Sequence, residues 1–155
     1  MPTDILKSAL HAALACIFLT MSGCAGLPKC TDAFTVDESA GRVVVYRKAA
    51  VMGFAVRHPV AIDNCQFGTL TNGGFIVGQL PPGDYQIAVL NDFGKPRNPQ
   101  RINVRSGEDM YLRWSFDVED VYVVGSTSGA TGRDVFTPVT REIAVSELEK
   151  LGELN

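Results

Sequence analysis

From Gly41 onward, short runs rich in β-branched and aromatic residues alternate with Gly, Pro, Asn and Asp. Such punctuation favours strands joined by tight turns and leaves little room for long helices. Nine runs have this character, namely 42–47, 59–63, 67–70, 75–80, 84–90, 100–105, 110–118, 121–125 and 135–140. Their number and spacing predict an all-β domain over residues 41–155, in which antiparallel sheets pack face to face as a β-sandwich.

The run 110–118 shows how such a strand divides its side chains between two faces. Alternate positions are apolar, and these are Met110, Leu112, Trp114, Phe116 and Val118. Because successive side chains of a strand point to opposite faces, this period of two predicts one buried face and one solvated face. Trp114 is therefore expected in the core and not on a ligand-binding surface.

The end of the chain has a helical signature. The sequence Ser146-Glu147-Leu148-Glu149 reads as a capping box, and Gly152 stands where a helix would stop. A short C-terminal helix is therefore predicted near residues 147–151.

The first residues have the pattern of an export signal. Lys7 gives a weakly positive start, and the apolar run Ala9–Leu19 is shorter than the roughly 20 residues that span a bilayer. This length is typical of the hydrophobic region of a secretory signal peptide. A buried amphipathic helix is the alternative, but the small residues that follow give such a helix no continuation. Residues 1–23 are interpreted as a signal peptide.

Met21-Ser22-Gly23-Cys24 resembles the bacterial lipobox, in which small residues precede the cysteine that receives a diacylglycerol. Met21 stands where leucine is usual. Cys24 is therefore the predicted lipid attachment site and the first mature residue. Ala25 follows it, and in lipoproteins of enteric-type bacteria a residue other than Asp at this place indicates the outer membrane, with the domain facing the periplasm. In the alternative, cleavage occurs nearby and Cys24 stays a thiol or half of a disulfide.

The chain has four cysteines, and their number favours lipidation. Cys16 would leave with the signal peptide. If Cys24 carries lipid, Cys30 and Cys65 remain, and they can form a disulfide in an oxidising compartment. The alternative is two thiols that never meet. Residues 24–40 are interpreted as a tether, which a Cys30–Cys65 bond would shorten.

The charge balance excludes a grip on nucleic acid. The formal net charge is -3, and no basic cluster appears along the chain. The expected partners are the membrane, through the lipid, and an envelope protein or glycan whose identity the sequence does not reveal.

Few residues point to catalysis, and no cofactor or metal is expected. His58 is the one histidine of the mature part, and no nucleophile elbow accompanies it. Asp117, Glu119 and Asp120 form an acidic cluster that would suit a glycosidase or contribute to a calcium site. A solvated turn between strands is the simpler interpretation of this cluster.

Two further segments lack a clear period. The apolar segment 49–56 is interpreted as a core strand or hairpin, with an exposed patch for a partner as the alternative. The Gly-rich segment 125–134 lacks the Lys-Ser/Thr pair of a phosphate loop, so it is interpreted as a mobile loop.

The motifs GRVVVYR, HPVAIDN, GGFIVGQLPPGDYQIAV and YLRW follow one another along residues 41–150. In this order they resemble small bacterial envelope lipoproteins that carry a single domain of unknown function. The strand after PPGDY is also similar to PEGA-type and transthyretin-like modules. The resemblance implies an extracytoplasmic sandwich, immunoglobulin-like or transthyretin-like, and no established activity.

Together these patterns lead us to expect a lipid-anchored, periplasm-facing lipoprotein that is not an enzyme and acts as a binding or structural module of the cell envelope. A periplasmic hydrolase that uses the acidic cluster and a carrier of a small ligand are the alternatives.

Overall fold

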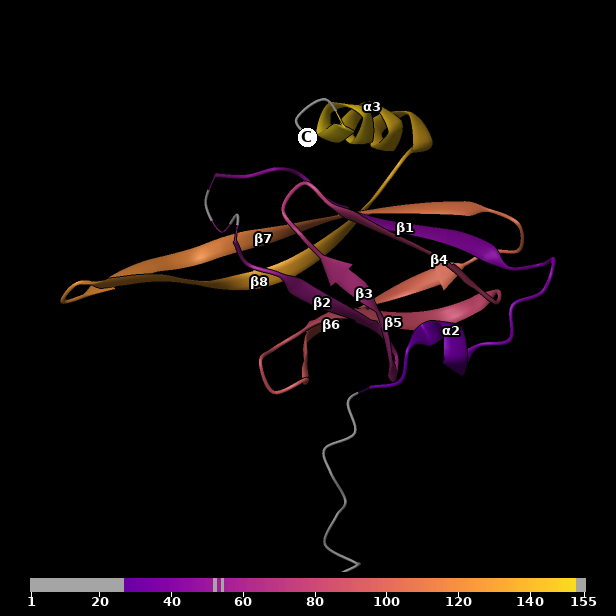
Figure 1. Cartoon of the computed structure of the whole chain (residues 1–155), viewed down its shortest axis with the longest axis horizontal. Helices are drawn as coiled ribbons and strands as arrows, with labels where there is room; N and C mark the ends of the chain where they lie inside the picture. The colour runs from indigo at the N-terminus through magenta and orange to yellow at the C-terminus, as the bar shows by residue number, and fades with distance from the viewer. Residues whose placement is uncertain (1–26, 52, 54, 153–155) are drawn as a thin grey trace, which may run out of the picture.

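The computed structural model describes residues 27–51, 53 and 55–152, and these contain two four-stranded sheets. The first sheet has the order β4–β1–β7–β8, with bounds β1 Gly41–Arg47, β4 Phe75–Leu80, β7 Asp109–Val124 and β8 Thr127–Val139. The second has the order β3–β2–β5–β6, with bounds β2 His58–Ile62, β3 Cys65–Leu70, β5 Gly83–Leu90 and β6 Pro96–Val104. Figure 1 shows the two sheets as stacked layers, with helix α3 (Arg141–Gly152) above the first.

The predicted β-sandwich is confirmed, with one unexpected pairing. All neighbouring strands run antiparallel except β1 and β7, which are parallel. Strands that follow one another along the chain pair most simply as antiparallel hairpins, and the sequence pattern predicted antiparallel sheets for this reason. The chain instead passes through the second sheet before β7 returns beside β1.

The core lies between the sheets and is built from alternate residues of each strand. Strands β1, β7, β2 and β5 each give it a row of buried side chains; these include Val43, Val45, Leu112, Trp114, Val60, Ile62, Ile87 and Val89. Trp114 is 6% exposed, so its predicted place in the core is confirmed.

Strand β1 is buried on both faces, which explains its unbroken apolar sequence. Val44 and Tyr46 point away from the main core and pack against Ala144 of α3. The helix is longer than predicted: the Ala144 N–H donates to the Thr140 carbonyl at 3.0 Å, so Ser146 lies within the helix and does not cap it. Ala144 and Leu148 lie one turn apart on the packed face, the spacing of an amphipathic helix.

The runs 110–118 and 121–125 are one long strand, β7, which pairs with β8 beyond the edge of the sheet. We call residues 117–133 the β7–β8 ribbon, and Figure 1 shows it projecting from the body of the sandwich. A bulge between Val118 and Asp120 interrupts its register. The acidic cluster therefore lies along a strand, and the interpretation as a turn is wrong.

The Gly-rich segment 125–134 is likewise mostly strand β8, which corrects the prediction of a mobile loop. Two of its glycines allow a close approach to β7. A Cβ atom at Gly129 would lie 2.5 Å from the Tyr122 ring, and one at Gly132 would lie 2.1 Å from the Asp117 carbonyl oxygen. Glycine in a strand often marks such a close approach.

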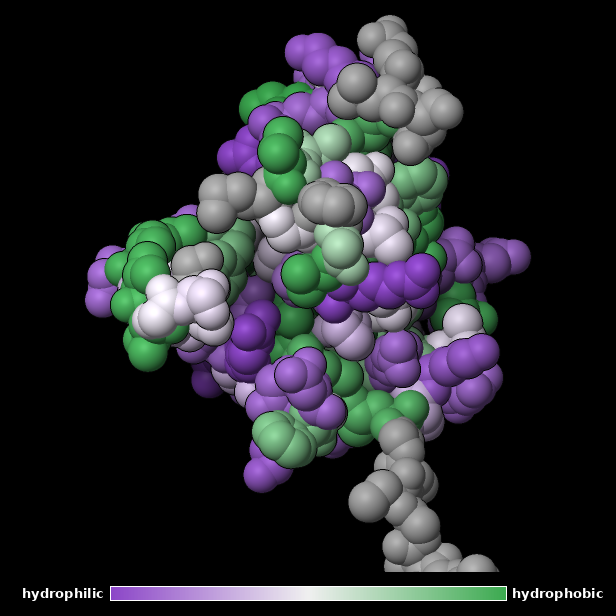
Figure 2. Space-filling model, turned by 60° about the vertical axis from the view of Figure 1, so that its left-hand side comes forward, coloured by the Kyte–Doolittle hydropathy of each residue, from purple (hydrophilic) through white to green (hydrophobic). Residues whose placement is uncertain are grey.

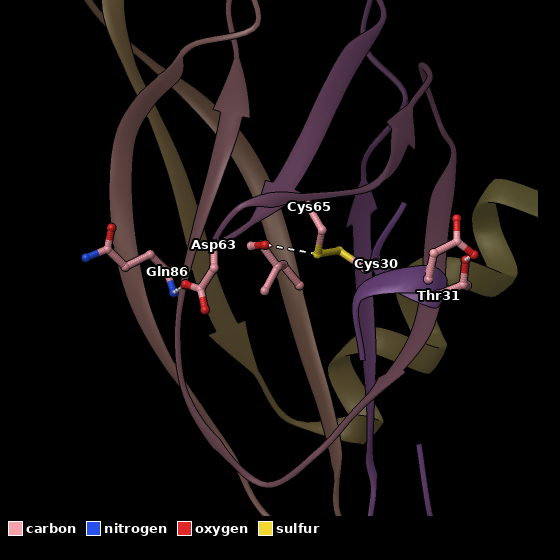
Figure 3. Close-up of a disulfide and its surroundings, with 7 residues drawn as sticks. Cys30, Thr31, Asp63, Cys65 and Gln86 are labelled. Atoms are coloured by element: carbon pink, nitrogen blue, oxygen red, sulfur yellow. Dashed lines mark hydrogen bonds between the residues drawn. A yellow bond between two sulfur atoms is a disulfide. The ribbon is translucent and has the colours of Figure 1, made fainter. Parts of the chain in front are cut away.

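The N-terminal segment is fixed to the second sheet by a disulfide. Cys30 begins the short helix α2 (Cys30–Ala33), and its sulfur is bonded to that of Cys65 (Figure 3). Both cysteines are buried, and the Gln66 N–H donates to the Pro28 carbonyl at 2.7 Å. The structure thus contains the predicted pair.

Cys65 begins β3 and does not lie in the turn of the hairpin that precedes it. The turn consists of Asp63 and Asn64, and Asp63 adopts a positive φ of 47°. Its carboxylate accepts a hydrogen bond from the Gln86 N–H at 2.7 Å (Figure 3). An Asx residue tolerates this conformation, which leaves the cysteine free for bonding.

Part of the predicted tether packs against the sandwich. The ring of Phe34 meets that of Tyr85 edge to face, with centroids 5.5 Å apart. The predicted signal peptide, residues 1–23, and the lipid site Cys24 lie outside the described residues. Within the described residues, no helix has the length and apolar character needed to cross a bilayer.

Candidate functional site

At one end of the sandwich the buried rows change from apolar to polar. Arg47 continues the row of Val43 and Val45 on β1, and its register partner on β7 is Trp114. Other strands contribute polar residues at the same end. We call this group the polar cluster; its members are Arg47, His58, Arg97, Gln100, Trp114 and Asp134.

Trp114 lies at the centre of the polar cluster. Its ring centroid is 4.2 Å from that of His58, and the Arg47 guanidinium carbon lies 5.2 Å from it. The indole N–H donates to a carboxylate oxygen of Asp134 at 3.2 Å. A cation over an indole face is attracted by the ring quadrupole, so Trp114 helps to hold the Arg47 charge.

Asp134 is a buried acidic residue that accepts hydrogen bonds from several neighbours. It is 2% exposed, and its carboxylate also pairs with Arg97, with a nitrogen–oxygen distance of 3.0 Å. The Gln100 amide N–H donates to the Asp134 carbonyl at 2.9 Å, and the Phe136 N–H donates to the Gln100 oxygen at 3.1 Å. Burial raises the pKa of Asp134, and the nearby Arg97 charge acts in the opposite direction.

Arg47 is only 5% exposed and has no carboxylate partner among the described residues. Its two terminal nitrogens donate to the Val56 carbonyl at 3.0 Å and to the Gly53 carbonyl at 2.8 Å. Burial lowers the pKa of Arg47, but a guanidinium keeps its proton at neutral pH. The side chain therefore carries a buried charge and holds the loop that follows β1.

This loop contains the apolar segment 49–56, and its described residues form no strand. Val51 is 92% exposed and Val56 is 50% exposed, so the interpretation as a core strand is wrong. Met52 and Phe54 lie outside the described residues. The Arg47 hydrogen bonds place the rest of the loop beside the polar cluster.

His58 stays neutral in the folded protein. Burial, together with the charges of Arg47 and Arg97, lowers its pKa from 6.5 to about 4. His58 is thus a stacking partner of Trp114 and not a cation at neutral pH. The side chain is half-buried at the start of β2.

The His58 pKa predicts how stability depends on pH. Between about pH 4 and pH 6.5, His58 is protonated in the unfolded chain and neutral in the folded chain. The free energy of unfolding therefore falls as the pH is lowered through this window. In this pH range the wild type should therefore take up as much as one more proton on unfolding than the His58→Gln variant does. Denaturant titrations at several pH values measure this, and wild type is compared with the variant because Asp134, whose pKa is raised, contributes with the opposite sign. Identical pH profiles would contradict the prediction.

A pocket of about 710 Å³ opens beside Trp114, and we call it the Arg47 pocket. Its cationic lining residues are Arg47, Lys48, Arg97 and Arg113, and its apolar wall includes Trp114, Phe116 and Val118. This volume lies in the range of small-molecule sites. A second hollow of about 660 Å³ shares Val56, His58 and Arg97 with it.

The sequence-predicted acidic cluster is not part of this site. Asp117, Glu119 and Asp120 lie on the β7–β8 ribbon and line neither hollow. In the described part of the chain, no group of three His, Cys, Asp or Glu side chains is placed to hold a metal ion. The ribbon instead exposes apolar side chains, and Figure 2 shows this hydrophobic surface; its most exposed members are Val121, Val123 and Val124.

Sequence reasoning missed most of the polar cluster and also Glu147 of α3. The Glu147 carboxylate accepts from the Tyr46 hydroxyl at 2.5 Å and pairs with Lys48 at 2.6 Å and Arg113 at 3.0 Å. The sequence did contain one signal for Arg47. It follows Val43 and Val45 at alternate positions of one strand, so its side chain is expected on the same buried face. Asp134 and Arg97 meet only through the sheet topology, so no local pattern marks them.

Fold and site together define an all-β sandwich domain, covered by one helix and stapled by a disulfide, with a cationic pocket at one end. The chain belongs to the protein family of unknown function DUF2846, whose model matches residues 37–138. A search of curated proteins finds no match.

The family match covers nearly the whole sandwich and every residue of the polar cluster. Cys30 and Glu147 lie outside it. The pocket is therefore part of the family domain, whereas the disulfide and the Glu147 contacts link that domain to the segments on either side.

Proposed function

We propose that the chain is a lipid-anchored, non-enzymatic lipoprotein of the cell envelope whose periplasm-facing β-sandwich acts as a binding module. The observation that carries this proposal is the Cys30–Cys65 disulfide. Disulfides persist in oxidising compartments and are rare where thiols are kept reduced. The bond therefore supports export, in agreement with the signal-like N-terminus and with the resemblance to envelope lipoproteins and PEGA-type or transthyretin-like modules.

The disulfide also sets the distance between domain and membrane. If lipid is attached at Cys24, only Ala25–Lys29 separate it from the bridge at Cys30. Fully extended, this segment reaches roughly 17 Å. A domain so close to the bilayer surface is suited to a partner in the same membrane or in the adjoining envelope. Ala25 supports the outer membrane as the destination.

The Arg47 pocket favours one particular kind of binding. A carrier of a small ligand needs a concave, partly apolar site with a few polar groups that fix orientation, and the pocket has this character. The carrier is therefore the second candidate function. An envelope protein or glycan as partner is the broader form of the same proposal.

Cys24→Ser tests the anchor. The variant is expected to accumulate as a longer, unlipidated precursor that no longer fractionates with membranes, because serine cannot form the thioether. Cys16→Ser is the matched control, since that residue lies in the hydrophobic region and its loss should leave processing unchanged. Cell fractionation with intact-mass analysis measures both. A Cys24→Ser chain retained in membranes with an unchanged mass refutes the lipid attachment.

A further inference from the structure

The buried charge of Arg47 has no counter-ion among the residues that the structure describes. In the part of the chain that the structure describes, no Asp or Glu oxygen lies within ion-pair distance of its guanidinium. Its partners are two backbone carbonyls and the Trp114 ring. Burying a charge without a partner is unfavourable, and removing it from water strengthens its attraction for an opposite charge. A site that holds such a cation favours an anionic ligand.

Hydrogen-bond donors remain at this place. A guanidinium has five N–H groups, and the two carbonyls accept from two of them. Arg97, which also lines the Arg47 pocket, has a buried Nε with no hydrogen-bond partner among the described residues. Two arginines that line the pocket therefore carry N–H groups for which the described residues supply no acceptor.

The surrounding charges add to this preference. Four cationic side chains line the pocket, and no carboxylate of the described residues does. Glu147 neutralises part of the charge of Lys48 and Arg113, and Asp134 neutralises Arg97. Four cations thus meet two carboxylates, although the whole chain has a net charge of -3. The Arg47 pocket is locally positive in an acidic protein.

The apolar part of the lining comes largely from β7. Trp114, Phe116 and Val118 occupy alternate positions of that strand, so they share one face. Trp114 is buried, Phe116 is half-buried and Val118 is exposed, which gives a surface that deepens toward Arg47. A ligand that follows this wall would meet apolar contacts first and the guanidinium at the inner end.

We propose that the Arg47 pocket binds a small amphipathic anion, a carboxylate or phosphate group on an apolar body. The anionic group lies at Arg47 and Arg97, and the body lies along Trp114, Phe116 and Val118. The inference deepens the proposed binding function and names the class of its ligand. It does not depend on where the protein is anchored, because the residues that line the pocket lie within residues 47–130.

Trp114 provides the readout, because it is the chain's one tryptophan. The chain is isolated from its own cells, in phosphatidylcholine vesicles if it carries lipid and in buffer if it does not. It is titrated with four probes that share a phenylbutyl body: 5-phenylpentanoate, 4-phenylbutyl phosphate, 4-phenylbutanol and 4-phenylbutylamine. At least one anion should change Trp114 emission in a saturable way. Its half-saturating concentration should be about 10-fold or more below those of the alcohol and the amine.

Three variants locate the binding. Arg47→Gln should lower the affinity for the anion about 10-fold or more, since it removes the charge but keeps an amide donor. Arg105→Gln is the matched control; it removes the same charge from a side chain that is 72% exposed and lies outside the pocket, so binding should be unchanged. Ala130→Phe fills the pocket from an exposed position and should weaken binding even if Arg47→Gln fails to fold.

The outcomes separate clearly. Preference for either anion, lost in Arg47→Gln and Ala130→Phe and kept in Arg105→Gln, supports the proposal, and the stronger anion identifies the head group. Equal binding of the alcohol or the amine overturns it, as does a folded chain that binds neither anion. Undiminished binding by Ala130→Phe also overturns it. Arg47 would then serve only to hold the loop after β1. None of these results bears on the Cys24→Ser test, which reports location alone.

Discussion

Replacing Cys30 and Cys65 together by serine is expected to lower the free energy of unfolding by about 4 kcal/mol. The bond joins residues with a sequence separation of 35, and in the chain-entropy model such a cross-link restricts the unfolded chain by this amount. Both side chains are buried, so placing two polar hydroxyls there would add a desolvation cost. Denaturant unfolding of the oxidised protein and of the double variant, followed by Trp114 fluorescence, measures the difference.

Reduction gives the matched control for this prediction. Dithiothreitol should destabilise the wild type by a similar amount and leave the double variant unchanged. The Gln66 N–H donates to the Pro28 carbonyl. Its amide exchange should be faster in the reduced wild type and in the double variant than in the oxidised wild type. Intact-mass analysis should find the oxidised chain lighter than the reduced chain by the two hydrogen atoms that the bond removes. Equal masses, or a double variant as stable as the wild type, would contradict the prediction.

The disulfide shows what residue counting can reach. Once Cys16 and Cys24 were assigned to processing and lipid, Cys30 and Cys65 were the remaining pair, and the structure joins them. The same pattern did not reveal that Cys65 starts a strand. Asp63 takes the positive φ of the turn, and this choice depends on its hydrogen bond to Gln86 of the neighbouring strand.

The β7–β8 ribbon shows where local patterns fail. Gly and Ser/Thr over residues 125–134 indicate a loop by composition. In the structure Gly129 lies beneath the Tyr122 ring, and Gly132 lies close against the neighbouring strand, so both glycines serve a strand pair. This information resides in the partner strand. A window of sequence that begins after Tyr122 does not contain it.

The polar cluster has a related explanation. Arg47 and Trp114 are register partners because β1 and β7 pair in parallel, and that pairing follows from a chain path through the second sheet. Period-two patterns gave the buried face of each strand correctly, including that of Trp114. They did not give the order of strands, so the meeting of Arg47, Trp114 and Asp134 was not predictable from spacing.

Trp114→Ala is expected to lower the free energy of unfolding by about 3–5 kcal/mol, the usual cost of truncating a large buried aromatic residue. The loss goes beyond volume, because the indole stacks on His58, lies beneath the Arg47 charge and donates to Asp134. Without it a buried guanidinium loses its aromatic partner and a buried carboxylate loses one donor. Chemical denaturation followed by circular dichroism measures the change, since the variant has no tryptophan.

Trp114→Phe separates packing from hydrogen bonding. Phenylalanine keeps a ring near His58 and Arg47 but has no N–H for Asp134, which retains its pair with Arg97. Its cost should be about 1–3 kcal/mol, smaller than that of alanine. Combining Trp114→Phe with Asp134→Ala should cost less than the sum of the two single changes, because each removes the same indole–carboxylate hydrogen bond. An alanine variant within about 1 kcal/mol of the wild type, or strictly additive costs in the double variant, would show that Trp114 does not organise the polar cluster.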